Sequence, residues 1–178
     1  EAIDLREHGF EHVILLLEGA FEAYEISIAA KMHFNLVVHN LHQLQMIEKL
    51  KLNRPLDIHF KINTGMNRLG LQLSELDKCQ SFLKKSNVLM THLACADNPE
   101  DELNQMQFSK FDEAWKYTGQ TLLRSIVNSA GSINFPEQSH DWSRVGIGMY
   151  GGLSDMPELK TAMTFRSQII GFQDLKIG

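Results

Sequence analysis

Cysteine, membrane-length apolar runs and clustered basic charge are all scarce in this 178-residue chain. Its two cysteines, Cys79 in a helical pattern and Cys95 after an apolar segment, have neither a metal-ligand nor a redox spacing. This predicts two reduced thiols and favours a cytoplasmic location. No apolar run approaches the roughly 20 residues of a membrane-spanning helix, so no membrane partner is expected. The 17 Lys and Arg residues are mixed with 22 Asp and Glu residues, and without a basic patch no nucleic-acid partner is expected.

Metal-ligand patterns are missing as well. The eight histidines show no HExxH or comparable spacing, which predicts no metal site. The chain does have 43% hydrophobic residues, enough to bury a sizeable core in a globular domain. Its first ten residues already have a helical pattern with no Met or targeting segment before them, so we expect further chain upstream.

Short apolar segments rich in β-branched residues predict six strands. They cover residues 13–19, 34–39, 56–63, 88–94, 125–130 and 144–150. Apolar residues at intervals of three or four predict helices in most of the gaps. These helices cover residues 21–33, 41–52, 73–86 and 104–118. Ser74 with Asp77 is the predicted capping box of the third helix.

This alternation of strands and helices predicts an α/β fold with a parallel sheet, either doubly wound or closed as a barrel. The pattern changes after Gly152, because the next strand-like segment has no helix before it. We therefore predict an α/β domain over residues 1–152, a linker over residues 153–160, and the first strand of a β-rich domain over residues 161–178.

Polar or small residues gather where the predicted strands end. They are Lys61 and Asn63 on the third strand, His92 on the fourth, Asn128 and Ser129 on the fifth, and Gly146 and Ile147 inside the sixth. In parallel α/β folds this end carries the active site, because the connecting loops and helix N-termini converge there. A strand-end site is therefore the functional hypothesis.

Each of these residues also has a purely structural interpretation. His92 fits a hydrogen-bonded core histidine, and Asn128 and Ser129 fit residues that end a strand in a turn. Arg144 fits a salt bridge at the rim, and the nearby glycines fit positions with positive φ. Spacing alone supports a parallel α/β domain with a polar strand-end site and leaves its chemistry open.

Four segments in this order add more than periodicity does. They are "KINTGMNRLG" at residues 61–70, "THLACAD" at 91–97, "NSAG" at 128–131 and "RVGIGMYG" at 144–151. Together they resemble alanine racemase, a family of pyridoxal-phosphate enzymes with a (β/α)8 TIM barrel, and the resemblance covers essentially the whole chain. The family pattern usually has Asp and Phe where this chain has Asn63 and Leu93. Neither departure touches a charge that handles the cofactor or a proton-transfer group.

The resemblance implies a cofactor pocket. Arg144 corresponds to the arginine that faces the pyridine nitrogen of pyridoxal 5'-phosphate. Because a guanidinium has only donors, it keeps that nitrogen unprotonated. Ser129 and the backbone N–H groups of Gly146 and Ile147 correspond to the phosphate cradle. Asn128 is implied as an orienting neighbour in that pocket.

The same resemblance implies a substrate site. Arg68 corresponds to the arginine that contacts the substrate carboxylate and the region of the cofactor hydroxyl. Lys61 corresponds to a lysine that carbon dioxide carboxylates in many family members, which turns its repulsion of Arg68 into attraction. His92 corresponds to a supporting histidine that links Arg144 to the catalytic tyrosine through hydrogen bonds.

The two groups that carry out racemisation in this family match no residue of this chain. One is a lysine that forms a Schiff base with the cofactor, and the other is a tyrosine from the second domain of the partner subunit. The lysine is expected upstream of Glu1 and the tyrosine soon after Gly178. The resemblance therefore implies an internal part of the protein with about six of the eight barrel strands, which is expected to be inactive alone.

The function implied for the intact protein is the interconversion of L-alanine and D-alanine by a homodimer, which supplies D-alanine for peptidoglycan. Decarboxylases that share the barrel are less expected, because they pair the pyridine nitrogen with a carboxylate where this chain has Arg144. Two alternatives stay open: a broad-specificity amino-acid racemase of the same fold, and a non-catalytic barrel protein that binds pyridoxal phosphate.

Overall fold

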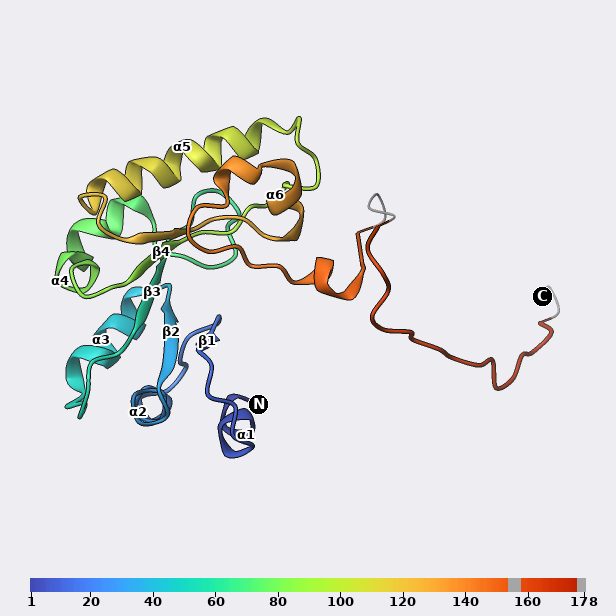
Figure 1. Ribbon diagram of the computed structural model, residues 1–178, viewed down its shortest axis with the longest axis horizontal. Helices are drawn as coiled ribbons and strands as arrows, with labels where there is room; N and C mark the ends of the chain where they lie inside the picture. Colours follow the sequence, from blue (N-terminus) through green and yellow to red (C-terminus); the bar gives the residue numbers. More distant parts are fainter. Residues whose placement is uncertain (154–157, 176–178) are drawn as a thin grey trace.

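Five parallel strands form the centre of the protein in a computed structural model that describes residues 1–153 and 158–175 (Figure 1). The strands are β1 (Ile14–Leu16), β2 (Phe34–Val38), β3 (Ile58–Lys61), β4 (Val88–Met90) and β5 (Leu123–Ser125). They lie in the sheet in the order in which they follow along the chain. A doubly wound sheet reverses its strand order at a switch point, whereas a barrel keeps it. The prediction of a parallel α/β fold that forms part of a TIM barrel is therefore confirmed.

The helices lie around the outside of this sheet (Figure 1). The α-helices are α1 (Ala2–Glu7), α2 (Ala23–Met32), α3 (Leu41–Lys49), α4 (Gln80–Leu83), α5 (Glu102–Tyr117) and α6 (Ser129–Asn134). Three 3-10 helices are η1 (Leu73–Cys79), η2 (Pro136–Gln138) and η3 (Ile147–Tyr150). Within the described residues no helix is long and apolar enough to cross a lipid bilayer.

Apolar side chains pack in two clusters between the sheet and these helices. The larger cluster includes Phe60 and Leu89 of the central strands and Phe111 of α5, all without exposed surface. The smaller cluster joins Ile26 of α2 to Leu36 of β2. Each large apolar side chain buried in this way contributes about 1.5–3 kcal/mol to the stability of the fold. The central strands are thus held firmly, which fixes the positions of the residues at their ends.

Side-chain caps start several helices, but the capping box predicted at Ser74 and Asp77 is wrong. Gln72 is the N-cap, and the Glu75 carboxylate accepts its backbone N–H at 2.8 Å. Ser74 already lies inside the helix that this box begins. The predicted helix over residues 73–86 is also shorter and of mixed type, since η1 is a 3-10 helix followed by the single turn of α4.

The sixth predicted strand, over residues 144–150, does not form. Arg144 donates its backbone N–H to Val127 O at 3.0 Å, but the N–H groups of Gly146 and Gly148 turn to Ser129 Oγ. Because those two donors bind a side chain, they are not available for a strand ladder. The chain instead enters η3. The fifth predicted strand is displaced too, since β5 ends at Ser125 and Ser129 begins α6.

The C-terminal segment leaves the body of the protein as extended chain (Figure 1). Residues 161–175 contain no strand, so the strand predicted there is absent from the described residues. A strand needs a hydrogen-bonded partner, and the backbone bond from Ala162 N–H to Tyr150 O is a single contact at 3.3 Å. Residues 154–157 of the predicted linker and 176–178 of the predicted strand lie outside the described residues. The division into domains stays a prediction.

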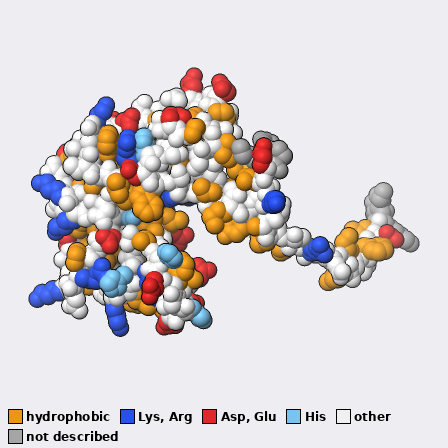
Figure 2. All heavy atoms as spheres, viewed as in Figure 1, with side chains coloured by type: hydrophobic (Ala, Val, Ile, Leu, Met, Phe, Trp, Pro, Cys, Tyr) orange, Lys and Arg blue, Asp and Glu red, His pale blue; other side chains and the backbone are white. Residues whose placement is uncertain are grey.

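Hydrophobic side chains are spread along this segment, as Figure 2 shows in orange. The most exposed of them are Phe165, Ile169, Ile170, Phe172 and Leu175, each at least 86% exposed. Each of these side chains therefore leaves nearly all of its apolar surface exposed.

Candidate active site

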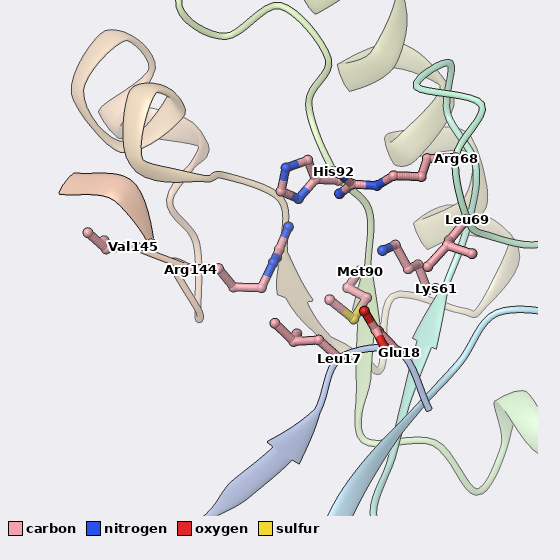
Figure 3. A pocket seen from close by; sticks show the side chains of 10 residues that line it. Leu17, Glu18, Lys61, Arg68, Leu69, Met90, His92, Arg144 and Val145 are labelled. Carbon is pink, nitrogen blue, oxygen red and sulfur yellow. The ribbon is translucent and has the colours of Figure 1, made fainter. Parts of the chain in front are cut away.

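The carboxyl ends of β1, β3 and β4 open into a cavity of about 470 Å³ (Figure 3). Five residues that the sequence singled out line it: Lys61, Arg68, His92, Arg144 and Gly146. Figure 3 shows the four polar side chains among them pointing into a common space from different strands and loops. The strand-end hypothesis named Lys61, His92 and Gly146, and the family resemblance added Arg68 and Arg144. The structure brings all five to one cavity, while their roles stay predictions.

The loop after β3 carries Arg68 to the cavity. The side chain of Asn63 organises this loop, since its Oδ1 accepts the N–H groups of Gly65 and Asn67, both at 3.1 Å. Its Nδ2 donates to Asn67 Oδ1 at 2.9 Å, and Asn67 has a positive φ of 58°. An aspartate would accept the same two N–H groups but would lack the donor. The asparagine therefore supports the fold of this loop and leaves the cavity unchanged.

Gly70 closes the loop against the end of β3. Leu71 then pairs with Ile62 in a parallel bridge, and Asn63 N–H donates to Leu71 O at 2.8 Å. Gly70 has a φ of 129°, and a Cβ there would lie 2.5 Å from backbone atoms of Ile62 and Asn63. Only glycine fits this close approach of two backbone segments. The second glycine of the quoted segment thus sets where the loop carrying Arg68 returns.

Arg144 crosses the ends of β4 and β5 from the loop before η3. Its guanidinium donates to Thr91 O, to Ser125 Oγ and to Ile126 O, the last at 3.1 Å. These bonds use three of the five N–H donors of the guanidinium. Burial lowers the pKa of Arg144 to about 10, so the group stays charged at neutral pH. The residue is a fixed cation beside the cavity, and not the rim salt bridge that was its structural alternative: no ion pair to it is found within the described residues.

Ser129, Gly146 and Gly148 form a small polar cradle next to Arg144. Ser129 Oγ accepts the N–H of Gly146 at 3.0 Å and that of Gly148 at 3.1 Å. Asn128 does not line the cavity but caps α6, since its Oδ1 accepts Gly131 N–H at 2.9 Å. Ile147 begins η3 with its side chain exposed. The structural alternative for Asn128, a side chain that binds local backbone, thus describes its contact with Gly131, while its Nδ2 also donates to Leu93 O at 3.5 Å.

Positive charge dominates the cavity. Burial lowers the pKa of Lys61 to about 8, and the nearby charges of Arg144 and Arg68 add to this effect. Burial and the same cations also lower the pKa of His92 to about 4, so its imidazole is neutral at physiological pH. Glu18 is the one acidic residue among the described residues that line the cavity. Such a site favours an anion.

His59 lies on β3 two residues before Lys61, so it faces the same side of the sheet. It is only 6% exposed, and its Nδ1 has no partner within the described residues. Asn35 Nδ2 approaches its Nε2 at 3.4 Å. Burial, with Arg144 as the second cause, lowers the pKa of His59 from 6.5 to about 4.

This lowered pKa predicts acid sensitivity. As the pH falls below 6.5 the unfolded chain takes up a proton at His59, whereas the folded chain does so only near pH 4. The contribution to stability is complete above pH 6.5 and is lost as the pH falls toward 4. We expect the free energy of unfolding of the full-length protein, measured by urea titration at each pH, to fall less steeply in this window for His59→Gln. Equal slopes for both proteins would contradict this assignment.

Other residues of the site were not found from the sequence. Glu18 lies two residues after the end of β1, near the same edge of the sheet as Lys61 at the end of β3. The strand-end rule applied to the first strand would therefore have found it. Thr91 and Ser125 accept hydrogen bonds from Arg144, but no local signal distinguishes them from other strand-terminal residues.

Comparisons with known proteins agree on one family. The family model described as "Alanine racemase, N-terminal domain" matches residues 1–154. The alanine racemase of Shewanella denitrificans is 34% identical over 190 residues, which cover 100% of this chain and 52% of the relative. The crystal structure of biosynthetic alanine racemase from Pseudomonas aeruginosa is 31% identical with a TM-score of 0.79, covering 90% of this chain and 48% of that one.

A further solved structure is the alanine racemase of Bartonella henselae with covalently bound pyridoxal phosphate. It is 25% identical with a TM-score of 0.77, and the match covers 90% of this chain and 49% of that chain. This chain thus spans about half the length of the relatives that it matches. The family model and the structural matches coincide with the part of the chain that forms the sheet and the cavity. The chain therefore belongs to the alanine racemase family.

Proposed function

We propose that the full-length protein containing this chain interconverts L-alanine and D-alanine with pyridoxal 5'-phosphate as cofactor. The relatives are alanine racemases, and one solved relative holds covalently bound pyridoxal phosphate. The observation that carries the proposal is Arg144, a partly buried cation. Three protein acceptors hold it at the cavity, and no carboxylate pairs with it within the described residues. A cation in this place suits a reaction that returns a proton to the same carbon.

The residues at the cavity fit this cofactor. Arg144 keeps its Nε–H and one Nη1–H for a further acceptor, such as a pyridine nitrogen. A Cβ built on Gly146 meets no atom within 4 Å, so the backbone at this position is open to an approaching phosphate oxygen. Ser129 keeps its hydroxyl hydrogen as a donor there, and the backbone N–H groups of Gly146 and Ile147 would be further donors once a phosphate oxygen replaces Ser129 Oγ as the acceptor of Gly146. When bound, pyridoxal phosphate would supply the electron-withdrawing ring that acidifies the α-proton of alanine.

Arg144 would set the reaction outcome. Because a guanidinium donates and does not give up its proton at neutral pH, it leaves the ring nitrogen unprotonated. The ring then withdraws fewer electrons, which favours return of the proton over transamination. Arg68, exposed at the mouth of the cavity, would bind the carboxylate of alanine with its planar fork of donors.

Further parts of the site would come from outside this chain. We propose that the lysine that binds the cofactor precedes this chain, and that the opposing tyrosine follows it and enters the site from a second subunit. The protein would then act as a homodimer in the cytoplasm and provide D-alanine for peptidoglycan. His92 would support this tyrosine through hydrogen bonds.

The test uses the purified full-length protein with pyridoxal phosphate. L-alanine and D-alanine are supplied separately, and both enantiomers are followed by chiral chromatography. We expect each to be converted to an equal mixture, with alanine converted faster than serine, lysine or arginine. Comparable rates for all four would support the broad-specificity alternative. Binding of the cofactor, seen by its absorbance, without conversion of any amino acid would overturn the proposed function and favour a non-catalytic binder.

A further inference from the structure

A buried polar network lies beneath the cavity, between α5 and the ends of β3 and β4. Its side chains are Gln107, Thr64 and Thr91, which are 0%, 0% and 1% exposed. Gln107 Nε2 donates to Thr64 Oγ1 at 3.0 Å, and the two threonine hydroxyls lie 2.8 Å apart. Polar side chains buried this deeply lower the stability of the fold unless their hydrogen bonds are made. The three side chains therefore depend on the partners that they have here.

Gln107 clamps the segment that carries His92. Its Nε2 donates to His92 O at 2.9 Å, and its Oε1 accepts Ala94 N–H, also at 2.9 Å. One amide thus binds the backbone on either side of Leu93. Because both bonds come from a residue packed inside α5, the peptide of His92 is fixed relative to a rigid helix instead of moving with its loop.

Thr91 connects the network to the other two strand ends. Its Oγ1 donates to Ile62 O at 3.0 Å, and Ile62 follows Lys61 directly in the sequence. Its backbone oxygen accepts a hydrogen bond from Arg144 Nη2. The same short chain of hydrogen bonds therefore reaches the backbone beside Lys61, the backbone of His92 and the guanidinium of Arg144.

We propose that Gln107, Thr64 and Thr91 are positioning residues, which hold His92 and Arg144 in the geometry needed for racemisation. This inference deepens the proposed function and rests on it. None of the three side chains lines the cavity, so each acts through the groups that it holds. A small misplacement of such groups lowers turnover more than it lowers substrate binding.

The test replaces one hydroxyl of the network in the full-length protein. Thr64→Val keeps the shape of the side chain but removes the partner of Gln107 and Thr91, and Thr64→Ser restores the hydroxyl. We expect Thr64→Val to lower kcat for alanine about ten- to a hundredfold with KM little changed. Thr64→Ser is expected to retain most of the activity. If Thr64→Val fails to fold, Thr64→Ala removes the same hydroxyl with a smaller side chain, which introduces no steric clash.

The matched control is Ser86→Ala. Ser86 is also buried, and its Oγ donates to Phe82 O at 2.9 Å, but it lies before β4 at the opposite end of the sheet. Ser86→Ala should lower the melting temperature of the protein without changing kcat for alanine. Thr64 variants that lose stability as Ser86→Ala does, and keep kcat, would reduce the network to a purely structural role and overturn the proposal.

A second readout separates this inference from the proposed function. The ring of His92 is followed by NMR in the full-length protein without cofactor. A loosened His92 should gain water and move away from Arg144, so its pKa should rise from about 4 in Thr64→Val but not in Thr64→Ser or Ser86→Ala. An unchanged titration overturns the positioning role. If the wild-type protein racemises nothing but Thr64→Val still raises the pKa of His92, the proposed function is overturned and the hold on His92 stays supported.

Discussion

Replacing Arg144 with glutamate is expected to lower alanine racemisation by the full-length protein about a hundred- to a thousandfold, the range for losing one oriented electrostatic contact in an active site. Two effects act together. A carboxylate would favour the protonated ring nitrogen that the guanidinium disfavours, so transamination should rise as racemisation falls. It would also replace a donor that binds Thr91 O and Ile126 O with a group that repels them.

The matched variant is Arg144→Lys, which keeps the charge but lacks the fork of donors that reaches three acceptors. We expect it to racemise faster than Arg144→Glu and slower than wild type. Racemisation and pyruvate formation from alanine are measured in parallel for all three proteins. An unchanged rate and an unchanged ratio of products in Arg144→Glu would refute the role given to this residue.

The titration of two histidines gives an independent check. Arg144 is the second cause, after burial, of the low pKa of both His59 and His92. Glutamate at this position should raise both pKa values, because a nearby anion stabilises an imidazolium. Arg144→Lys should leave them close to wild type. This check does not depend on bound cofactor.

The sheet was predictable because buried parallel strands are nearly continuous apolar segments. Val37, Phe60 and Leu89 are all fully buried, and each lies in a segment that the sequence assigned to a strand. Lys61 and His92 were found by the same logic, since a polar residue at or near the end of such a segment lies at the carboxyl end of the sheet. The sequence thus located the cavity through its strands.

The segment after Trp142 misled the prediction because a distant side chain decides its structure. Its β-branched and glycine residues fit a strand, but Ser129 Oγ takes the N–H groups of Gly146 and Gly148. A competing acceptor 17 residues away in the sequence leaves no local signal. The capping box failed in a similar way, because the pattern expects Ser or Thr at the N-cap, which favours Ser74, and only the path of the chain selects Gln72.

Gln107 is a polar residue at a position that helical periodicity assigns to the buried face of a helix, and this pattern is a signal of a buried polar network. It lies four residues before Phe111 on the same face of α5, and Phe111 is fully buried. A polar residue in a core position needs partners inside the fold. Its partners, Thr64 and the backbone around His92, come from two other strand ends, which only the folded structure brings within reach.

Lys61→Ala is expected to lower kcat/KM for alanine at least about tenfold, with partial recovery when acetate or formate is added. The reason is the state of the amine. Because burial and two arginines lower its pKa to about 8, Lys61 holds a substantial neutral fraction near pH 7.5. A neutral amine adds carbon dioxide: a nitrogen–carbon bond forms, one proton goes to solvent, and a carbamate anion results.

A carbamate would reverse the electrostatics of the cavity. As a cation Lys61 repels Arg68 and Arg144, and as an anion it attracts them and can orient the guanidinium of Arg68 toward the alanine carboxylate. The 13C NMR spectrum of the full-length protein with labelled bicarbonate should show a carbamate signal that is absent from Lys61→Ala. The signal should weaken as the pH falls below about 8, because protonation removes the reactive amine.

Two matched variants separate the charge of Lys61 from its length. Lys61→Glu places a permanent carboxylate near the same position and should be more active than Lys61→Ala without added anions. Lys61→Arg keeps a cation that carbon dioxide does not modify, so it should be no more active than Lys61→Ala, and acetate should not rescue it. If Lys61→Arg were as active as wild type while Lys61→Glu was inactive, the site would need a cation here. Arg68 would then meet its substrate without an anionic partner from β3.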